Sequence, residues 1–135
     1  REGYLTLAEW QEFTEPYDRI VLESIGDKPS ILHTCGIYGN PERFVGYPIQ
    51  GLHLAESAPG NSPIAGSERW LGRIAAMGGV DERLFGTGAE AQIAVMARTS
   101  VDDNRRRPFL LAPECTVDMT STEAELRALR EAAES

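Results

Sequence analysis

The sequence has a shortage of positive charge, no long apolar run and only two cysteines. Thirteen lysines and arginines stand against 21 acidic residues, so the net charge of -8 argues against binding a phosphate backbone and hence nucleic acid. No stretch approaches the roughly 18 apolar residues of a membrane span, and we expect no signal peptide. We therefore expect a cytoplasmic protein that makes no membrane contact.

The composition is that of an ordinary globular domain. The chain has 135 residues, of which 41% are hydrophobic and 25% charged, and this size suits one domain over residues 1–135. Its first residue is Arg1 rather than a methionine. We expect the chain to be a fragment of a longer protein.

Both cysteines and one of the two histidines form the pattern His33, Cys35 and a distant Cys115. A structural zinc ion takes four protein ligands, whereas a catalytic zinc ion takes about three and leaves one position open. The set of three favours a catalytic zinc site. His33 and Cys35 also close one apolar run while Cys115 closes another, and residues two apart in a strand point to the same side. One ion could therefore bind all three.

Two alternatives to a zinc site stay open. A free cysteine is among the most buried residue types and often serves as a small core residue. A disulfide between Cys35 and Cys115 is the second alternative, although the composition is not that of a small secreted disulfide scaffold.

Helical and strand patterns alternate along the chain. A capping box of Thr6 and Glu9 begins a helix that Pro16 interrupts and Gly26 ends. Further patterns predict strands at 29–35, 49–55, 73–77 and 109–112, and helices at 42–45, 65–71, 89–100 and from Ser121 or Thr122 onward.

Four apolar strands separated by helices predict a parallel α/β sheet, and the chemistry of such sheets lies at the C-terminal strand ends. Glu56 and Asp81 follow the second and third strands. They are candidate catalytic residues, as a transient fourth metal ligand, a partner of His33 or a substrate contact, with a loop-bracing role as the alternative. We expect His53 to be a hydrogen-bonded core residue, Trp10 and Trp70 to be core, and Arg105–Arg107 to form a solvated loop.

Three segments resemble the C-terminal half of the uroporphyrinogen decarboxylase superfamily. They are Ile31–Gly36, Met77–Asp81 and Leu111–Val117, the last followed by Leu126–Leu129. The resemblance covers nearly the whole chain and implies the second half of a (β/α)8 TIM barrel. A half barrel leaves strand edges and an inner face uncovered, so we expect a homo-oligomer or pairing with the missing barrel half.

The pattern of His33, Cys35 and Cys115 is similar to that of one branch, the zinc-dependent corrinoid methyltransferases of the methylcobamide:coenzyme M type. This branch implies a zinc ion that binds a small thiol as its thiolate, and a methylcorrinoid (cobalamin) donor carried by another protein or domain. In this branch a glycine usually precedes the last cysteine, whereas this chain has Glu114. The difference implies either that a backbone conformation with positive φ is lost or that a carboxylate lies beside the metal. The alternatives are a decarboxylase-like carboxy-lyase and a non-catalytic half barrel that assembles with a partner.

Overall fold

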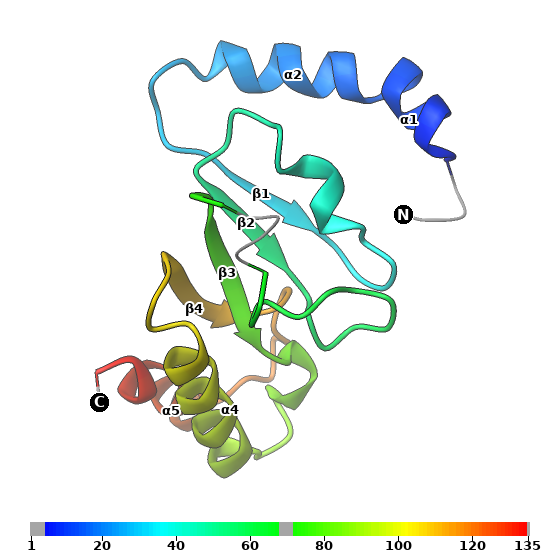
Figure 1. Cartoon of the computed structure of the whole chain (residues 1–135). Helices are drawn as coiled ribbons and strands as arrows, with labels where there is room; N and C mark the ends of the chain where they lie inside the picture. Colours follow the sequence, from blue (N-terminus) through cyan, green and yellow to red (C-terminus); the bar gives the residue numbers. More distant parts are fainter. Residues whose placement is uncertain (1–4, 68–71, 135) are drawn as a thin grey trace.

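The computed structural model describes residues 5–67 and 72–134. The elements are α1 (Leu7–Phe13), α2 (Glu15–Ser24), β1 (Ile31–Thr34), β2 (Gly51–Leu54), β3 (Ala75–Val80), α4 (Glu90–Asp103), β4 (Phe109–Pro113) and α5 (Glu123–Ala133), with short 3-10 helices at Pro41–Phe44 and Glu82–Leu84 (Figure 1). Residues 65–67 of the helix expected at 65–71 form a turn. The rest of that helix, including Trp70, lies outside the described residues.

The four strands form one parallel sheet in the order β1-β2-β3-β4. The predicted α/β fold with four parallel strands is thus confirmed. Strand β3 runs to Val80, three residues beyond its expected end, because Gly78 and Gly79 pair with Leu111 and Ala112 of β4. Strands β1 and β4 are the two edges of the sheet, and this order decides how the candidate site is built.

One face of the sheet is covered and carries the core. A register row on this face passes through all four strands at Leu32, Leu52, Ala76 and Phe109. Leu52 and Ala76 are fully buried, and they pack in a cluster that includes Trp10 of α1. The expectation that Trp10 is a core residue is confirmed. Burial of this row holds the sheet against the N-terminal helices through apolar contact.

The opposite face of the sheet is open. Its register row holds His33, His53, Met77 and Leu110. Ile31, two residues before His33 in β1, is 52% exposed, and Leu110 is 46% exposed. Such exposure is unusual for apolar residues of a strand. Within the described residues, no helix packs on this face, which corresponds to the inside of a barrel.

The N-terminal helices follow their sequence signals closely. Thr6 and Glu9 form the expected capping box, and the helix breaks at Thr14 so that Pro16 sits in the first turn of α2, where a missing N–H costs nothing. Only Trp10 of this pair of helices is buried. The side chains of Tyr17, Ile20 and Val21 on α2 are each more than 60% exposed, at 64%, 63% and 62%. Within the described residues, little of the chain covers this apolar side of α2.

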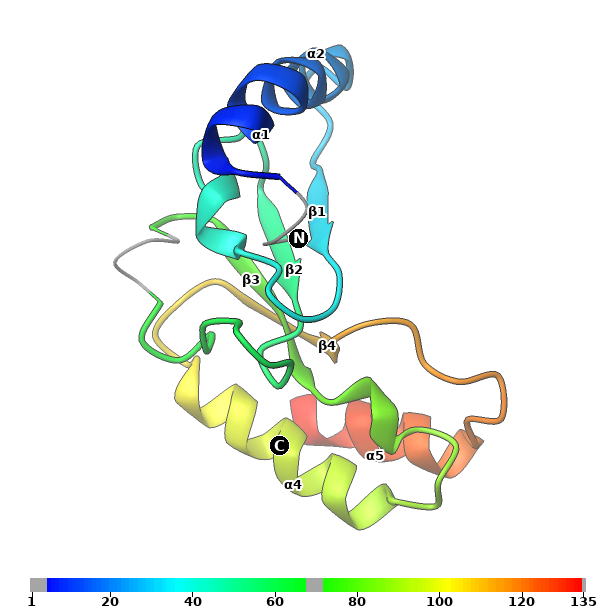
Figure 2. The ribbon, with the colours of Figure 1, turned by 90° about the vertical axis from the view of Figure 1, so that its right-hand side faces the viewer.

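Helices α4 and α5 lie side by side beyond β3 and β4 (Figure 2). Their shared core joins Val80 of β3, Ile93 and Ala97 of α4, and Ala132 of α5. The loop between α4 and β4 differs from expectation at one residue. Arg107, expected in a solvated loop, is partly buried because its guanidinium donates a hydrogen bond of 2.7 Å to the carbonyl of Ile64 and another to the Ser67 hydroxyl.

Glu125 anchors α5 through a buried carboxylate. The carboxylate accepts hydrogen bonds from the backbone N–H groups of Gly86, Thr87, Gly88 and Thr122 at 2.7–3.0 Å. Gly86 itself has a φ of +82°, and a Cβ there would lie 2.4 Å from the Thr120 hydroxyl oxygen. The amide donors lower the pKa of Glu125 to about 2. The ionised carboxylate therefore ties the loop after β3 to the start of α5.

We predict that Glu125→Gln lowers the melting temperature at neutral pH, because the amide cannot offer four N–H donors a charged acceptor. The folded pKa of about 2 lies below the usual 4.5, so this carboxylate stabilises the fold above pH 4.5 and loses that effect as the pH falls toward 2. The variant should lose less stability than the wild type over this window. Glu123→Gln is the matched control, since Glu123 is exposed on the same helix turn. Equal melting curves for both variants would contradict the prediction.

We predict that the isolated chain self-associates, because the open sheet face, the two strand edges and the apolar side of α2 would be covered in a dimer or larger species. Sedimentation velocity at micromolar concentration measures this. Tyr17→Glu should shift the distribution toward monomer if α2 is part of the contact. A compact, well-folded monomer of the wild-type chain at that concentration would contradict the prediction.

Candidate metal centre

The three predicted ligands come from the two edge strands of the sheet. His33 lies in β1, and Cys35 is the first residue after the end of β1. Cys115 lies two residues after the end of β4. Thr34 between the first two is buried at 6% exposure, and His33 and Cys35 are both exposed. His33 and Cys35 thus share the open face of the sheet while Thr34 points into the core, as the strand alternation predicts.

The distances between the ligand atoms suit a tetrahedral zinc ion. Zn–S bonds of about 2.3 Å and Zn–N bonds of about 2.0–2.1 Å at tetrahedral angles place two sulfurs about 3.8 Å apart and a sulfur and a nitrogen about 3.5–3.6 Å apart. The Sγ atoms of Cys35 and Cys115 are 3.8 Å apart, and Cys115 Sγ lies 3.6 Å from His33 Nε2. All three ligand atoms lie within 4.8 Å of one another. The site could hold a metal ion with one position left for a further ligand.

The structure shows neither alternative for the two cysteines. They form no disulfide here, since their Sγ atoms are 3.8 Å apart and an S–S bond is about 2.05 Å long. A core role needs burial, whereas Cys35 is exposed and Cys115 only partly buried. The thiols face the open side of the sheet, where an ion and a substrate have access.

The environment of His33 favours the neutral imidazole that metal binding requires. Partial burial of its ring lowers the pKa of His33, although the residue as a whole is exposed, and charge on the neighbouring His53 would lower the pKa further. A hydrogen bond from the ring to the His53 backbone acts in the opposite direction. A ligating histidine commonly donates its other ring N–H to a backbone carbonyl, so this bond also suits a ligand.

His53 stands beside the candidate ligands, in the neighbouring strand. It is the register partner of His33, and the two rings have centroids 4.5 Å apart. Its Nε2 lies 2.8 Å from the carbonyl oxygen of Pro113. His53 is thus hydrogen-bonded, as expected, although it is half-buried at the open face and not enclosed in the core.

Glu114 does not place its carboxylate among the ligand atoms. It is fully buried, and its two oxygens accept hydrogen bonds of 2.9 Å from the Ser57 N–H and hydroxyl. Its backbone φ is not positive. Burial raises the pKa of Glu114 to about 7, against the effect of the Ser57 hydrogen bonds. Its role is to tie the end of β4 to the loop after β2.

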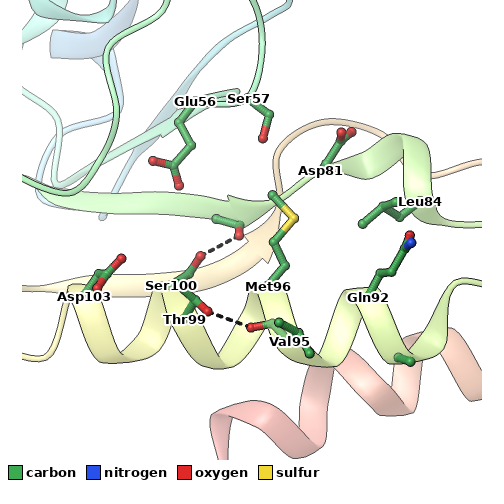
Figure 3. A pocket seen from close by; sticks show the side chains of 12 residues that line it. Glu56, Ser57, Asp81, Leu84, Gln92, Val95, Met96, Thr99, Ser100 and Asp103 are labelled. Carbon is green, nitrogen blue, oxygen red and sulfur yellow. Dashed lines mark hydrogen bonds between the residues drawn. The ribbon is translucent and has the colours of Figure 1, made fainter.

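Glu56 and Asp81 face a different space from the three ligands. Both line a groove of about 770 Å³ along α4, with the apolar side chains of Val95 and Met96 on its floor (Figure 3). Glu56 accepts a hydrogen bond from Ile64 N–H, and burial raises the pKa of Glu56. The Asp81 carboxylate is held by the Arg83 side chain and N–H, which lowers its pKa. Both carboxylates brace loops, and their catalytic role stays a prediction.

Asn61 is a structural residue near the site that the sequence patterns did not single out. Its amide donates to the carbonyls of Gly36 and Ala55 and its oxygen accepts from Gly39 N–H. It therefore fixes the loop that follows Cys35. Beside this loop, a recess of about 310 Å³ opens next to His33 and Cys35, with Leu32 and Phe44 in its wall.

Comparison with known proteins identifies the family. The sequence model of the uroporphyrinogen decarboxylase (URO-D) family matches residues 1–135. The chain belongs to the uroporphyrinogen decarboxylase family. The resemblance carried by its three strand-end segments is thereby confirmed. Among curated protein sequences, none matches this chain.

The fold of this family member is similar to that of a solved "methyltransferase from Methanosarcina mazei". The TM-score is 0.80 at 17% sequence identity, and the match covers 96% of this chain and 37% of the methyltransferase chain. At this identity the likeness concerns the fold. The chain thus spans about 37% of the length of that relative. None of the helices formed by residues 5–67 and 72–134 has the length and apolar character needed to cross a bilayer.

We predict about one zinc ion per chain, bound through His33, Cys35 and Cys115, because the distances from Cys115 Sγ to the other two ligand atoms match those of a tetrahedral zinc ion and all three atoms lie within 4.8 Å. Elemental analysis after dialysis against a weak chelator should show loss of the metal in Cys35→Ser. Thr116→Ala, which changes the exposed residue next to Cys115, is the matched control and should retain it. Equal zinc content in Cys35→Ser and in the control would rule out the site.

Proposed function

We propose that the complete protein is a zinc-dependent methyltransferase that moves a methyl group from a methylcorrinoid to a thiol. The convergence of His33, Cys35 and Cys115 at zinc-like distances carries the proposal. The resemblance supports it, because the methyltransferase branch has this ligand pattern and the decarboxylase branch lacks the cysteine pair. The similarity to a methyltransferase structure agrees with it at the level of the fold.

The charges of the candidate ligands suit thiol chemistry. Bound at this site, zinc would supply a Lewis acid that keeps a substrate thiol ionised at neutral pH. Cys35 and Cys115 would bind as thiolates and balance a divalent charge, while His33 binds as the neutral imidazole that its lowered pKa favours. A substrate sulfur bound at such an electron-rich centre would keep its nucleophilicity. No separate general base is then required.

Access to the centre fits a bimolecular transfer. His33 and Cys35 are exposed on the open face at the C-terminal end of β1, where a small thiol could reach a bound ion. The corrinoid would approach on another protein or domain, since the sequence has no cobalamin-binding pattern. The corrinoid partner and the cytoplasmic location are parts of this proposal.

Glu56 and Asp81 enter the proposal as candidate catalytic carboxylates. Both line the groove along α4, and neither belongs to the group of three residues that could hold a metal ion among the described residues. A contact with substrate or partner through this groove suits them better than metal ligation.

We predict that Cys115→Ala in the full-length, zinc-loaded protein reduces methyl transfer to the rate without enzyme. Cys115 is only partly buried, so the fold should survive the change. The absorbance change on demethylation of methylcobalamin, with a series of small thiols, measures the reaction. Thr116→Ala should retain the wild-type rate.

The same preparation distinguishes the alternative within the family. A full-length, zinc-loaded protein that leaves methylcobalamin unchanged with every thiol, yet decarboxylates an acetate-bearing porphyrinogen, would replace the methyltransferase proposal by a carboxy-lyase. A protein inactive in both assays would favour a non-catalytic half barrel that assembles with a partner.

A further inference from the structure

His53 bridges two strands that are not neighbours in the sheet. It belongs to β2, whereas the Pro113 carbonyl that its Nε2 contacts at 2.8 Å belongs to β4, and β3 lies between them. The side chain therefore crosses the open face of the sheet above β3. Pro113 ends β4 two residues before Cys115. The contact thus reaches the backbone that carries one of the candidate ligands.

The chemistry of this contact fixes the state of the His53 ring. A carbonyl oxygen only accepts hydrogen bonds, so Nε2 of His53 must donate and carry the proton. The nitrogen that points at β4 is thereby occupied and does not offer a lone pair to a metal ion. Consistently, His53 is not a member of the group of three residues that could hold an ion among the described residues.

On its other side, His53 contacts His33. The two rings are 4.5 Å apart between centroids with an interplanar angle of 38°, and the His53 backbone hydrogen-bonds the His33 ring. The same backbone carbonyl accepts a hydrogen bond of 3.4 Å from the Thr34 hydroxyl. One residue therefore restrains the ring of the β1 ligand and the backbone next to the β4 ligand.

We propose that His53 is a positioning residue of the metal centre, which sets the separation and orientation of His33 and Cys115 without binding the ion. This inference rests on the proposed zinc site. It goes beyond that site because His53 lies outside the His33, Cys35 and Cys115 pattern. Partners that orient ligands in this way typically change metal affinity by about 10–100-fold when removed.

Two substitutions separate the two contacts of His53. His53→Phe retains a flat ring to pack on His33 and removes the hydrogen bond to Pro113. His53→Gln removes the ring but has an N–H donor at the same number of bonds from Cα as Nε2 of histidine. Met77→Leu is the matched control, since Met77 is the register partner of His53 on β3 and leucine is similar in volume.

The test uses the full-length protein with two readouts that do not depend on activity. The first is the zinc dissociation constant from competition with a chromophoric chelator. The second is the visible absorption of the cobalt(II)-substituted protein at saturation, which reports the geometry of the thiolate and imidazole ligands. Thermal unfolding of each metal-free variant gives its folded fraction.

We expect His53→Phe to weaken zinc binding about 10-fold or more and to change the cobalt(II) spectrum at saturation. His53→Gln should lie closer to the wild type in both readouts, and Met77→Leu should equal it. Wild-type affinity and spectrum in His53→Phe would overturn the proposal. A loss of affinity that only follows the folded fraction, with an unchanged spectrum, would also overturn it. So would a His53→Gln variant that binds zinc no more tightly than His53→Phe.

Failure of the zinc site itself gives a different result. A wild-type protein that takes up neither zinc nor cobalt(II) overturns both the proposed function and the role of His53. A wild-type protein that binds both metals, with His53 variants that behave identically to it, overturns the role of His53 alone.

Discussion

The curvature of the four-stranded sheet is the constraint on which the candidate site depends. His33 and Cys35 lie on one edge strand and Cys115 follows the other, with two strands between them. In a flat sheet three strand spacings of about 4.8 Å would separate these edges by roughly 14 Å. The two thiol sulfurs are nevertheless 3.8 Å apart. The sheet must therefore curl around its open face, as part of a barrel does, for a metal centre to exist.

Two glycines in β3 permit the close packing that this curvature requires. Gly78 and Gly79 have φ angles of +142° and +97°. A Cβ on Gly78 would lie 2.7 Å from the Leu54 carbonyl oxygen of β2, and one on Gly79 would lie 2.8 Å from Ser100 of α4. A side chain at either position would push β3 away from its neighbours. The Ser100 hydroxyl instead bonds the Gly79 carbonyl at 2.6 Å and holds α4 against the strand.

Local patterns were enough to predict the strands, the caps of the first and last helices and the shared direction of His33 and Cys35. They could not predict contacts that depend on curvature. The sequence places Glu56 and Asp81 at strand ends, yet only the three-dimensional structure shows that they line the groove along α4. The sequence predicts Arg107 to be one of three arginines in a solvated loop. In the structure its guanidinium instead donates a hydrogen bond to the Ile64 carbonyl. Long-range hydrogen bonds have no periodic signature in a sequence.

The end of β4 shows how the fold places Cys115. The chain beyond Pro113 places Cys115 beside His33 on the open face, whereas the Glu114 side chain is buried on the opposite side. On that opposite side the Glu114 carboxylate binds Ser57, which follows β2, and on the open side His53 of β2 binds the Pro113 carbonyl. Both sides of this strand end are therefore tied to β2, although β3 separates β2 from β4 in the sheet. This double attachment holds Cys115 toward His33 where a single edge strand would be free to move, and it explains why a buried glutamate is tolerated next to a candidate ligand.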